Sequence, residues 1–123
     1  MKKSWHQHIK RSPREARTHP DGTVFDSKAE LKYYGTLIYR QLAGEIKNLR
    51  CQVRHELILP VVDRPVLTPK GRISSYTSDF EWDECDTGEH IIVDIKGYRD
   101  KTSSLRIALF EAIYDVKVRI IKV

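Results

Sequence analysis

An amphipathic helix is predicted for residues 27–43, because apolar side chains recur there every three or four positions. Asp26 and Ser27 are suitable N-cap residues, and Gly44 provides a stop signal. Glu30 falls in the first or second turn, where the helix dipole favours an acidic side chain. The chain therefore begins its regular structure with a helix that carries an acid near its N-terminus.

Strands dominate the middle of the chain, and a helix and a closing strand follow them. The uninterrupted run of Ile91, Ile92 and Val93 indicates a strand that is central in its sheet and covered on both faces. Hydroxyl residues at 102–104 precede the second helical pattern and are capping candidates. The predicted elements after the first helix are a strand over 49–59, a long connection containing Pro60, Pro65, Pro69 and Gly71, strands over 73–82 and 90–96 joined by an acidic turn over 83–89, a helix over 105–113, and a strand over 116–123. This order predicts an α/β fold without internal repeats.

The net charge of +5 lies entirely in the N-terminal segment that ends at His19. The rest of the chain balances 16 of the 22 basic residues against 16 of the 17 acidic ones. Residues 1–20 are therefore predicted to form a flexible basic arm that binds DNA phosphates, with a solubilising tail as the alternative. The length predicts one domain over residues 21–123, and the lack of a long apolar run predicts a soluble, cytoplasmic protein. The basic residues of the arm, opposed only by Glu15, are Lys2, Lys3, Lys10, Arg11, Arg14 and Arg17.

Asp94 and Lys96 stand two residues apart on a predicted strand, so their side chains leave the same face of the sheet. Asp79 belongs to the neighbouring strand, about 5 Å away. Two carboxylates at that distance repel by about 3 kcal/mol at an effective dielectric of about 20, and Glu30 adds to this repulsion if its helix packs over the sheet. Mg²⁺ would balance such a cluster, because it favours a few carboxylates together with waters and phosphate oxygens. The alternative is a weak surface ion pair between Asp94 and Lys96 beside a solvated Asp79.

Four segments, together with the order of the elements, resemble the PD-(D/E)XK nuclease superfamily. The resemblance is closest to a family of short phage-encoded endonucleases that are similar to Holliday-junction resolvases. It implies a core of helix, three strands, helix and strand, in which helices flank a mixed central sheet. It places Glu30, Asp79, Asp94 and Lys96 at the catalytic positions, with the three acids as metal ligands and Gln52 near the site. The matching segments are Phe25-Asp26-Ser27-Lys28-Ala29-Glu30, Ala43-Gly44-Glu45-Ile46-Lys47-Asn48-Leu49 with Gln52, Tyr76-Thr77-Ser78-Asp79-Phe80, and Val93-Asp94-Ile95-Lys96-Gly97.

This resemblance implies a Mg²⁺-dependent endodeoxyribonuclease that hydrolyses phosphodiester bonds, with Mn²⁺ able to substitute. We expect a branched substrate such as a Holliday junction, a role in phage recombination or replication inside a bacterial host, and a homodimer, since a four-way junction has two-fold symmetry. Further contacts with the DNA backbone are expected from Lys70, Arg72, Arg99 and Lys101. One departure concerns the second helix, where such proteins often carry lysines and this chain has Arg106 followed by apolar residues.

Two other functions remain open. A non-catalytic DNA-binding protein on a nuclease-like scaffold would use the basic arm, would need no metal, and would bind with a strong dependence on salt. An RNA-directed nuclease, or a subunit of a larger restriction or transposition assembly, is the third reading.

Overall fold

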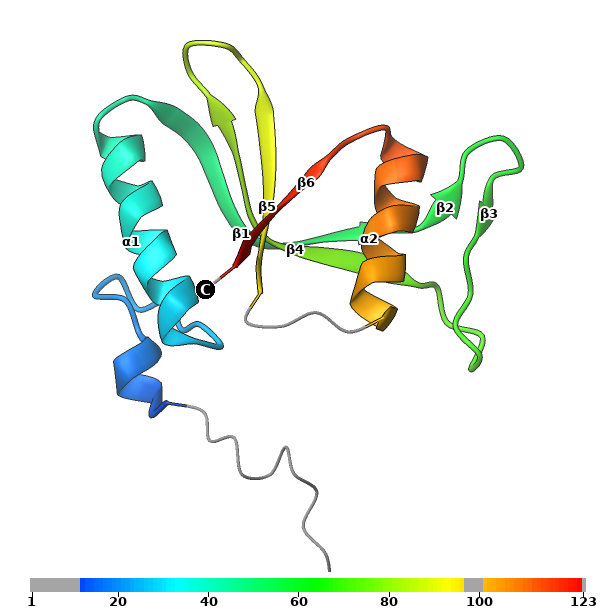
Figure 1. The fold of residues 1–123 in the computed structure, drawn as a ribbon, viewed down its shortest axis with the longest axis horizontal. Helices are drawn as coiled ribbons and strands as arrows, with labels where there is room; N and C mark the ends of the chain where they lie inside the picture. Colours follow the sequence, from blue (N-terminus) through cyan, green and yellow to red (C-terminus); the bar gives the residue numbers. More distant parts are fainter. Residues whose placement is uncertain (1–11, 97–100, 123) are drawn as a thin grey trace, which may run out of the picture.

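The computed structural model describes residues 12–96 and 101–122 (Figure 1). No helix in this part of the chain is long and apolar enough to cross a membrane. The elements are the short 3-10 helix η2 (Arg14–Arg17), α1 (Lys28–Leu42), β1 (Ile46–Glu56), β2 (Ile58–Leu59), β3 (Arg64–Pro65), β4 (Ser75–Glu84), β5 (His90–Lys96), α2 (Lys101–Tyr114) and β6 (Val118–Lys122).

The central sheet has four strands in the order β1-β4-β5-β6. β4 pairs antiparallel with both β1 and β5, whereas β6 pairs parallel with β5. A parallel pair needs a long crossover connection, and α2 lies in that connection. The architecture is therefore mixed α/β with a mixed central sheet and two helices, in agreement with the predicted fold class at this level.

Two apolar cores lie on opposite faces of this sheet. Ile91 and Val93 belong to the core that includes Leu37 of α1, whereas Ile92 belongs to the core that includes Phe110 of α2. Because successive side chains of a strand point to opposite faces, the two helices cover opposite faces of the sheet, as their placement in Figure 1 also shows. The prediction of a central, doubly covered strand is confirmed.

The element boundaries agree with the predictions in some places and differ in others. The first helix has Ser27 as its N-cap and Ala43 as its C-cap, and β5 spans the predicted residues. β1 starts three residues earlier than predicted, and the chain leaves the central sheet after Glu56 to form the separate β2–β3 hairpin. α2 begins at Lys101, so the hydroxyl residues at 102–104 lie inside its first turn and their prediction as caps is wrong.

Residues 12–20 fold against the domain, so the predicted flexible arm does not extend through them. Arg17 is only 8 % exposed. Its guanidinium donates hydrogen bonds to the backbone carbonyls of Ser12 and Phe25. Thr18 forms a β-bridge with Val24. The structure thus gives Arg17 a structural role in place of the predicted DNA contact.

Candidate active site

The candidate site begins where β4 and β5 separate. The pairing of these strands ends at Phe80 and Val93, and the next residues outward are Asp79 and Asp94. Asp79 turns towards β5, where its Oδ2 accepts a hydrogen bond of 2.7 Å from the backbone N–H of Ile95. The carboxyl groups of Asp79 and Asp94 are close enough to share a hydrogen bond. The two aspartates that were predicted to converge from neighbouring strands do so.

Asp94 is held from two sides. Its Oδ1 lies 3.4 Å from Nζ of Lys96, which leaves the same face of β5. Its Oδ2 accepts a hydrogen bond of 3.1 Å from the hydroxyl of Tyr76. The Asp94 side chain is only 4 % exposed, whereas that of Lys96 is 23 % exposed. The lysine therefore stays beside the acids with part of its surface open to a ligand.

Glu30 approaches this pair from the first turn of α1, next to the N-cap of the helix. The backbone N–H of Glu30 donates to Oγ of Ser27, the N-cap residue of the helix, and the Glu30 carboxylate accepts hydrogen bonds from the Ser27 side chain and from the backbone of Asp26. Oε2 of Glu30 is buried and has no hydrogen-bond partner in the described part of the chain. Burial raises the pKa of Glu30, and the charges of Asp26 and Asp94 raise it further. A buried carboxylate oxygen without a donor is poised for a cation.

The acids of the site resist carrying their full negative charge. Burial, the hydrogen bond shared with Asp94 and the charges of Asp94 and Glu30 together raise the pKa of Asp79 to about 7. The N–H of Ile95 acts in the opposite direction. Near neutral pH the negative charges of the site are therefore not fully balanced, although Lys96 lies beside them, and a bound cation would be favoured.

A cavity of about 180 Å³ opens at the same place, with enough room for a phosphate group. α2 contributes Arg106 to the wall of this cavity, which Asp94 and Lys96 of β5 also line. The sequence left phosphate contacts from this helix in doubt, because apolar residues follow Arg106. Ile107 and Phe110 are buried against the sheet, which leaves Arg106 on the exposed edge of the helix beside the cavity. The cavity is lined by Ser75, Tyr76, Thr77, Asp94, Lys96 and Arg106.

Gln52, in β1, lies across from Asp79 in β4. The flanking pairs are Cys51 with Phe80 and Val53 with Ser78. Gln52 itself has a φ of 53°, in the left-handed region that residues other than glycine adopt at a cost of about 1–2 kcal/mol. Its Nε2 is 3.4 Å from Oδ1 of Asp79, a long hydrogen bond. The predicted position of Gln52 near the site is therefore observed, and backbone strain accompanies it.

Comparison with known protein families matches residues 13–123 to the family described as "Protein of unknown function (DUF1064)". The chain belongs to this family. A comparison with curated proteins finds no match. Membership of DUF1064 carries no stated activity, so the chemistry of this DUF1064 protein has to be argued from its own side chains.

The basic residues predicted to contact DNA fall into four groups. Arg14, Lys70 and Arg72 are exposed. Arg17 is buried, as described above. Lys101 starts α2, and its side chain is not described. The residues that lie outside the described part of the chain are Lys2, Lys3, Lys10, Arg11 and Arg99.

The residues present fit a magnesium ion only as an open site. Across residues 12–96 and 101–122, no three side chains of the His, Cys, Asp and Glu types gather closely enough to form a complete metal site. Mg²⁺ commonly takes just one or two protein carboxylates and completes its octahedron with waters and substrate phosphates. Asp79 and Asp94 satisfy that requirement, and the Glu30 oxygen without a donor lies in the same electrostatic neighbourhood.

Proposed function

We propose that this protein is a metal-dependent DNA endonuclease of the PD-(D/E)XK superfamily. The observation that carries the proposal is the meeting of Asp79 and Asp94 where β4 and β5 separate, with the amine of Lys96 beside them. Two further features support it. The main elements follow the order helix, strands, helix, strand, and the last strand pairs parallel with the strand that carries Asp94 and Lys96. Membership of the DUF1064 family does not argue for or against this activity.

Asp79 and Asp94 would hold the Mg²⁺, and Mn²⁺ has the same preference for oxygen ligands. A bound ion of this kind supplies Lewis-acid polarisation of the phosphate and lowers the pKa of a coordinated water. Tyr76 fixes the Asp94 carboxylate by donating to Oδ2, so that Oδ1 remains directed to Lys96. Glu30 provides a carboxylate that can accept a proton from, or orient, the attacking water.

Positive side chains would receive the phosphate. Lys96 is held next to Asp94 and can donate to a non-bridging phosphate oxygen as negative charge develops in the transition state. Arg106 of α2 lines the same cavity and offers a planar set of donors that suits a phosphodiester. The cleft thus places acids on the side of the strands and a guanidinium on the side of α2.

The preferred substrate within this proposal is branched DNA, such as a Holliday junction, and the preferred context is phage recombination or replication. A four-way junction has two-fold symmetry, so this role calls for a homodimer that places two sites on opposed strands. Substrate preference and oligomeric state are separate parts of the proposal, because a monomer that cuts linear duplex would still be a nuclease.

The experiment compares end-labelled four-way junctions, flaps and linear duplexes incubated with purified protein in Mg²⁺, in Mn²⁺ and in EDTA. Asp94→Ala is the test variant. Asp86→Ala, in the exposed turn between β4 and β5, is the matched control that also removes one negative charge. We expect metal-dependent cutting by the wild type and the control, and none by Asp94→Ala. Equal cutting by all three proteins, or no cutting of any substrate, would refute the proposal, and binding without cutting would favour a non-catalytic DNA-binding protein.

A further inference from the structure

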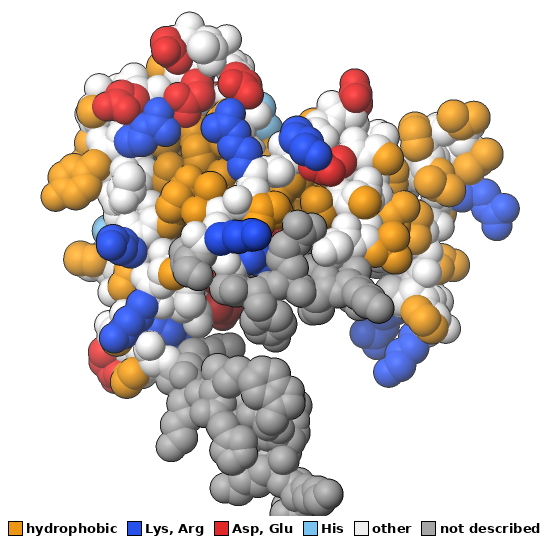
Figure 2. Space-filling view, in the orientation of Figure 1, with side chains coloured by type: hydrophobic (Ala, Val, Ile, Leu, Met, Phe, Trp, Pro, Cys, Tyr) orange, Lys and Arg blue, Asp and Glu red, His pale blue; other side chains and the backbone are white. Residues whose placement is uncertain are grey.

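A second surface outside the catalytic cleft is also built for contact. The segment 57–74, which we call the finger, contains the β2–β3 hairpin and projects beyond α2 (Figure 1). It carries five of the ten large hydrophobic side chains that are exposed among the described residues. Val61, at the tip, is 96 % exposed. Figure 2 shows apolar side chains gathered on this projecting part of the molecule. The five are Leu59, Val61, Val62, Leu67 and Ile73.

The finger is an ordered unit, which makes its exposed apolar surface informative. Leu57 is completely buried at its base and packs in the core beneath α2. Backbone hydrogen bonds join Val66 to Leu57 at 2.8 Å and Ser74 to Val66 at 2.7 Å. A second small turn is closed by a bond of 2.7 Å from Thr68 N–H to the carbonyl of Arg72. A rigid element that keeps aliphatic side chains in water is typical of a binding surface.

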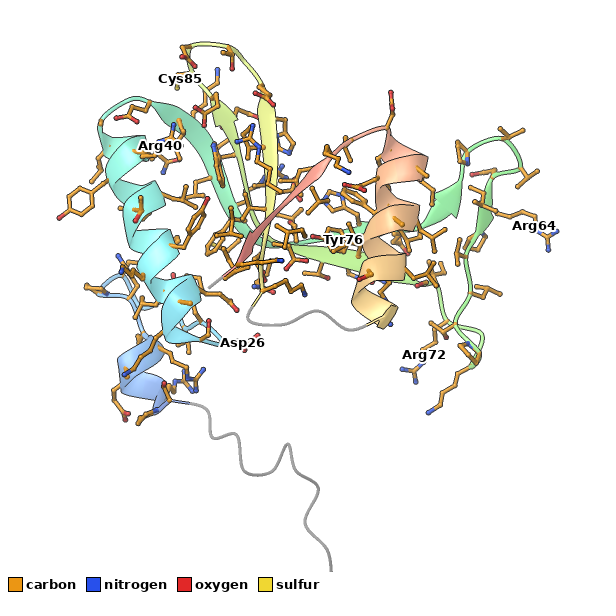
Figure 3. All side chains as sticks on the ribbon, viewed as in Figure 1. Asp26, Arg40, Arg64, Arg72, Tyr76 and Cys85 are labelled. Atoms are coloured by element: carbon orange, nitrogen blue, oxygen red, sulfur yellow. The ribbon has the colours of Figure 1, made fainter. Side chains whose placement is uncertain are left out.

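The charges of the finger indicate what it binds. Arg64, Lys70 and Arg72 are all exposed, and Asp63 is the one acid between residues 57 and 74. Arg64, in β3, and Arg72, in the turn that precedes β4, extend outward from two different parts of the finger (Figure 3). An isologous contact between two copies would bring together two surfaces of the same net positive charge, which disfavours self-association through this surface. A polyanion with apolar faces, which is a nucleic acid with accessible bases, matches both the charge and the apolar tip.

The C-terminal end of the finger lies next to the cavity. Its last residue, Ser74, leads directly into Ser75, which lines the cavity with Tyr76 and Thr77. Arg72 is three residues before Ser75, a span of at most about 10 Å. This corresponds to about three base steps of duplex, at roughly 3.4 Å each. A DNA strand that enters the cavity can therefore reach the basic turn of the finger a few nucleotides away.

We propose that the finger is a wedge for branched DNA, with Val61 and Val62 packing against bases where stacking is interrupted while Arg64, Lys70 and Arg72 bind the flanking phosphates. The inference rests on the proposed function in taking DNA as the ligand. Apolar wedges between stacked bases must separate them at a cost, whereas a branch point already presents open base faces. The finger therefore selects branched over continuous duplex DNA.

The test measures binding of the full chain in EDTA, so that cutting cannot interfere. The ligands are a four-way junction and a linear duplex, each carrying 2-aminopurine, which fluoresces more when unstacked. The test variant is Val61→Ser with Val62→Ser. The matched control is Tyr39→Ser with Leu42→Ser on α1, which removes side chains that are 77 % and 80 % exposed. Circular dichroism checks that each variant is folded.

We expect the wild type and the control to prefer the junction and to raise the fluorescence at its branch. The double valine variant should lose about tenfold in that preference and lose the fluorescence change. Lys70→Gln with Arg72→Gln should lower the log-log salt slope of binding by about 2. Unchanged preference and fluorescence in the valine variant would overturn the inference, as would a change confined to the oligomeric state seen by sedimentation.

The two proposals fail in different ways. If the valine variant binds and cuts every substrate as the wild type does, the finger has no wedge role while the nuclease proposal stands. If the wild type never cuts but binds junctions in a manner that depends on the valines, the nuclease proposal fails while the finger stands.

Discussion

Asp79→Asn is expected to stabilise the metal-free protein at about pH 8 and to stabilise it less at about pH 5. The pKa of Asp79 is raised from its ordinary value of 3.8 to about 7, first by burial and then by Asp94. Between pH 3.8 and about pH 7 the folded protein keeps a proton on Asp79 that the unfolded chain has released. The free energy of unfolding therefore falls as the pH rises through this range. Asparagine has no charge to desolvate, and its side-chain oxygen can still accept from the N–H of Ile95.

The size of the effect follows from the same pKa. A difference from 3.8 to about 7 corresponds to about 4 kcal/mol, at about 1.4 kcal/mol per pH unit. Asp79 keeps part of its side chain in water and shares its titration with Asp94, and both reduce this figure. We expect a gain of about 1–2 kcal/mol in the free energy of unfolding at about pH 8, or a rise in Tm of roughly 3–8 °C.

Thermal unfolding followed by circular dichroism in EDTA measures this gain. Asp83→Asn is a matched control on the same strand. The pKa of Asp83 is lowered, first by the hydrogen bond from Asn48 and then by that from His90, so the same substitution there should destabilise the protein at about pH 8. Excess Mg²⁺ should raise the Tm of the wild type and not that of Asp79→Asn. A lower Tm for Asp79→Asn at both pH values would refute the electrostatic account of the site.

Three further substitutions test separate parts of the structure. Arg17→Ala should lower the free energy of unfolding, measured by denaturant titration, by about 2–3 kcal/mol, because it leaves two backbone carbonyls without donors. The salt dependence of DNA binding should stay the same. A weaker salt dependence with unchanged stability would contradict the structural role of Arg17. Tyr76→Phe removes the hydroxyl that donates to Asp94, so kcat should fall about tenfold and the response of activity to Mg²⁺ should weaken, while KM stays close to that of the wild type. Activity that depends on Mg²⁺ concentration as in the wild type would argue against this positioning role. Measured on one cleavable duplex, Arg106→Ala should lower kcat/KM by about 10²-fold and Arg106→Lys should lower it by less. If both variants are as active as the wild type, Arg106 does not bind the phosphate.

The regular elements could be predicted well where local signals were complete. The Ser27 cap, the helical spacing after it and the Gly44 stop define α1, and the apolar run of β5 identified the central strand. Prediction was less accurate where tertiary contacts override local preference. The hydroxyl residues at 102–104 resemble caps but lie within α2, and the basic pattern around Arg17 suggested a mobile arm although its guanidinium is buried.

The sequence by itself determined that Asp94 and Lys96 share one face of a strand, since the period of a strand is two residues, and that Glu30 lies at the start of a helix. Tertiary structure alone decided that the β4–β5 pairing ends immediately before Asp79 and Asp94, and that Gln52 adopts a left-handed conformation across from Asp79. It also decided that Arg106 faces the same cavity, and that the valines of the finger remain in water. The physical reason is that spacing along one element is set by local backbone geometry, whereas the meeting of distant side chains depends on strand register and packing across the sheet.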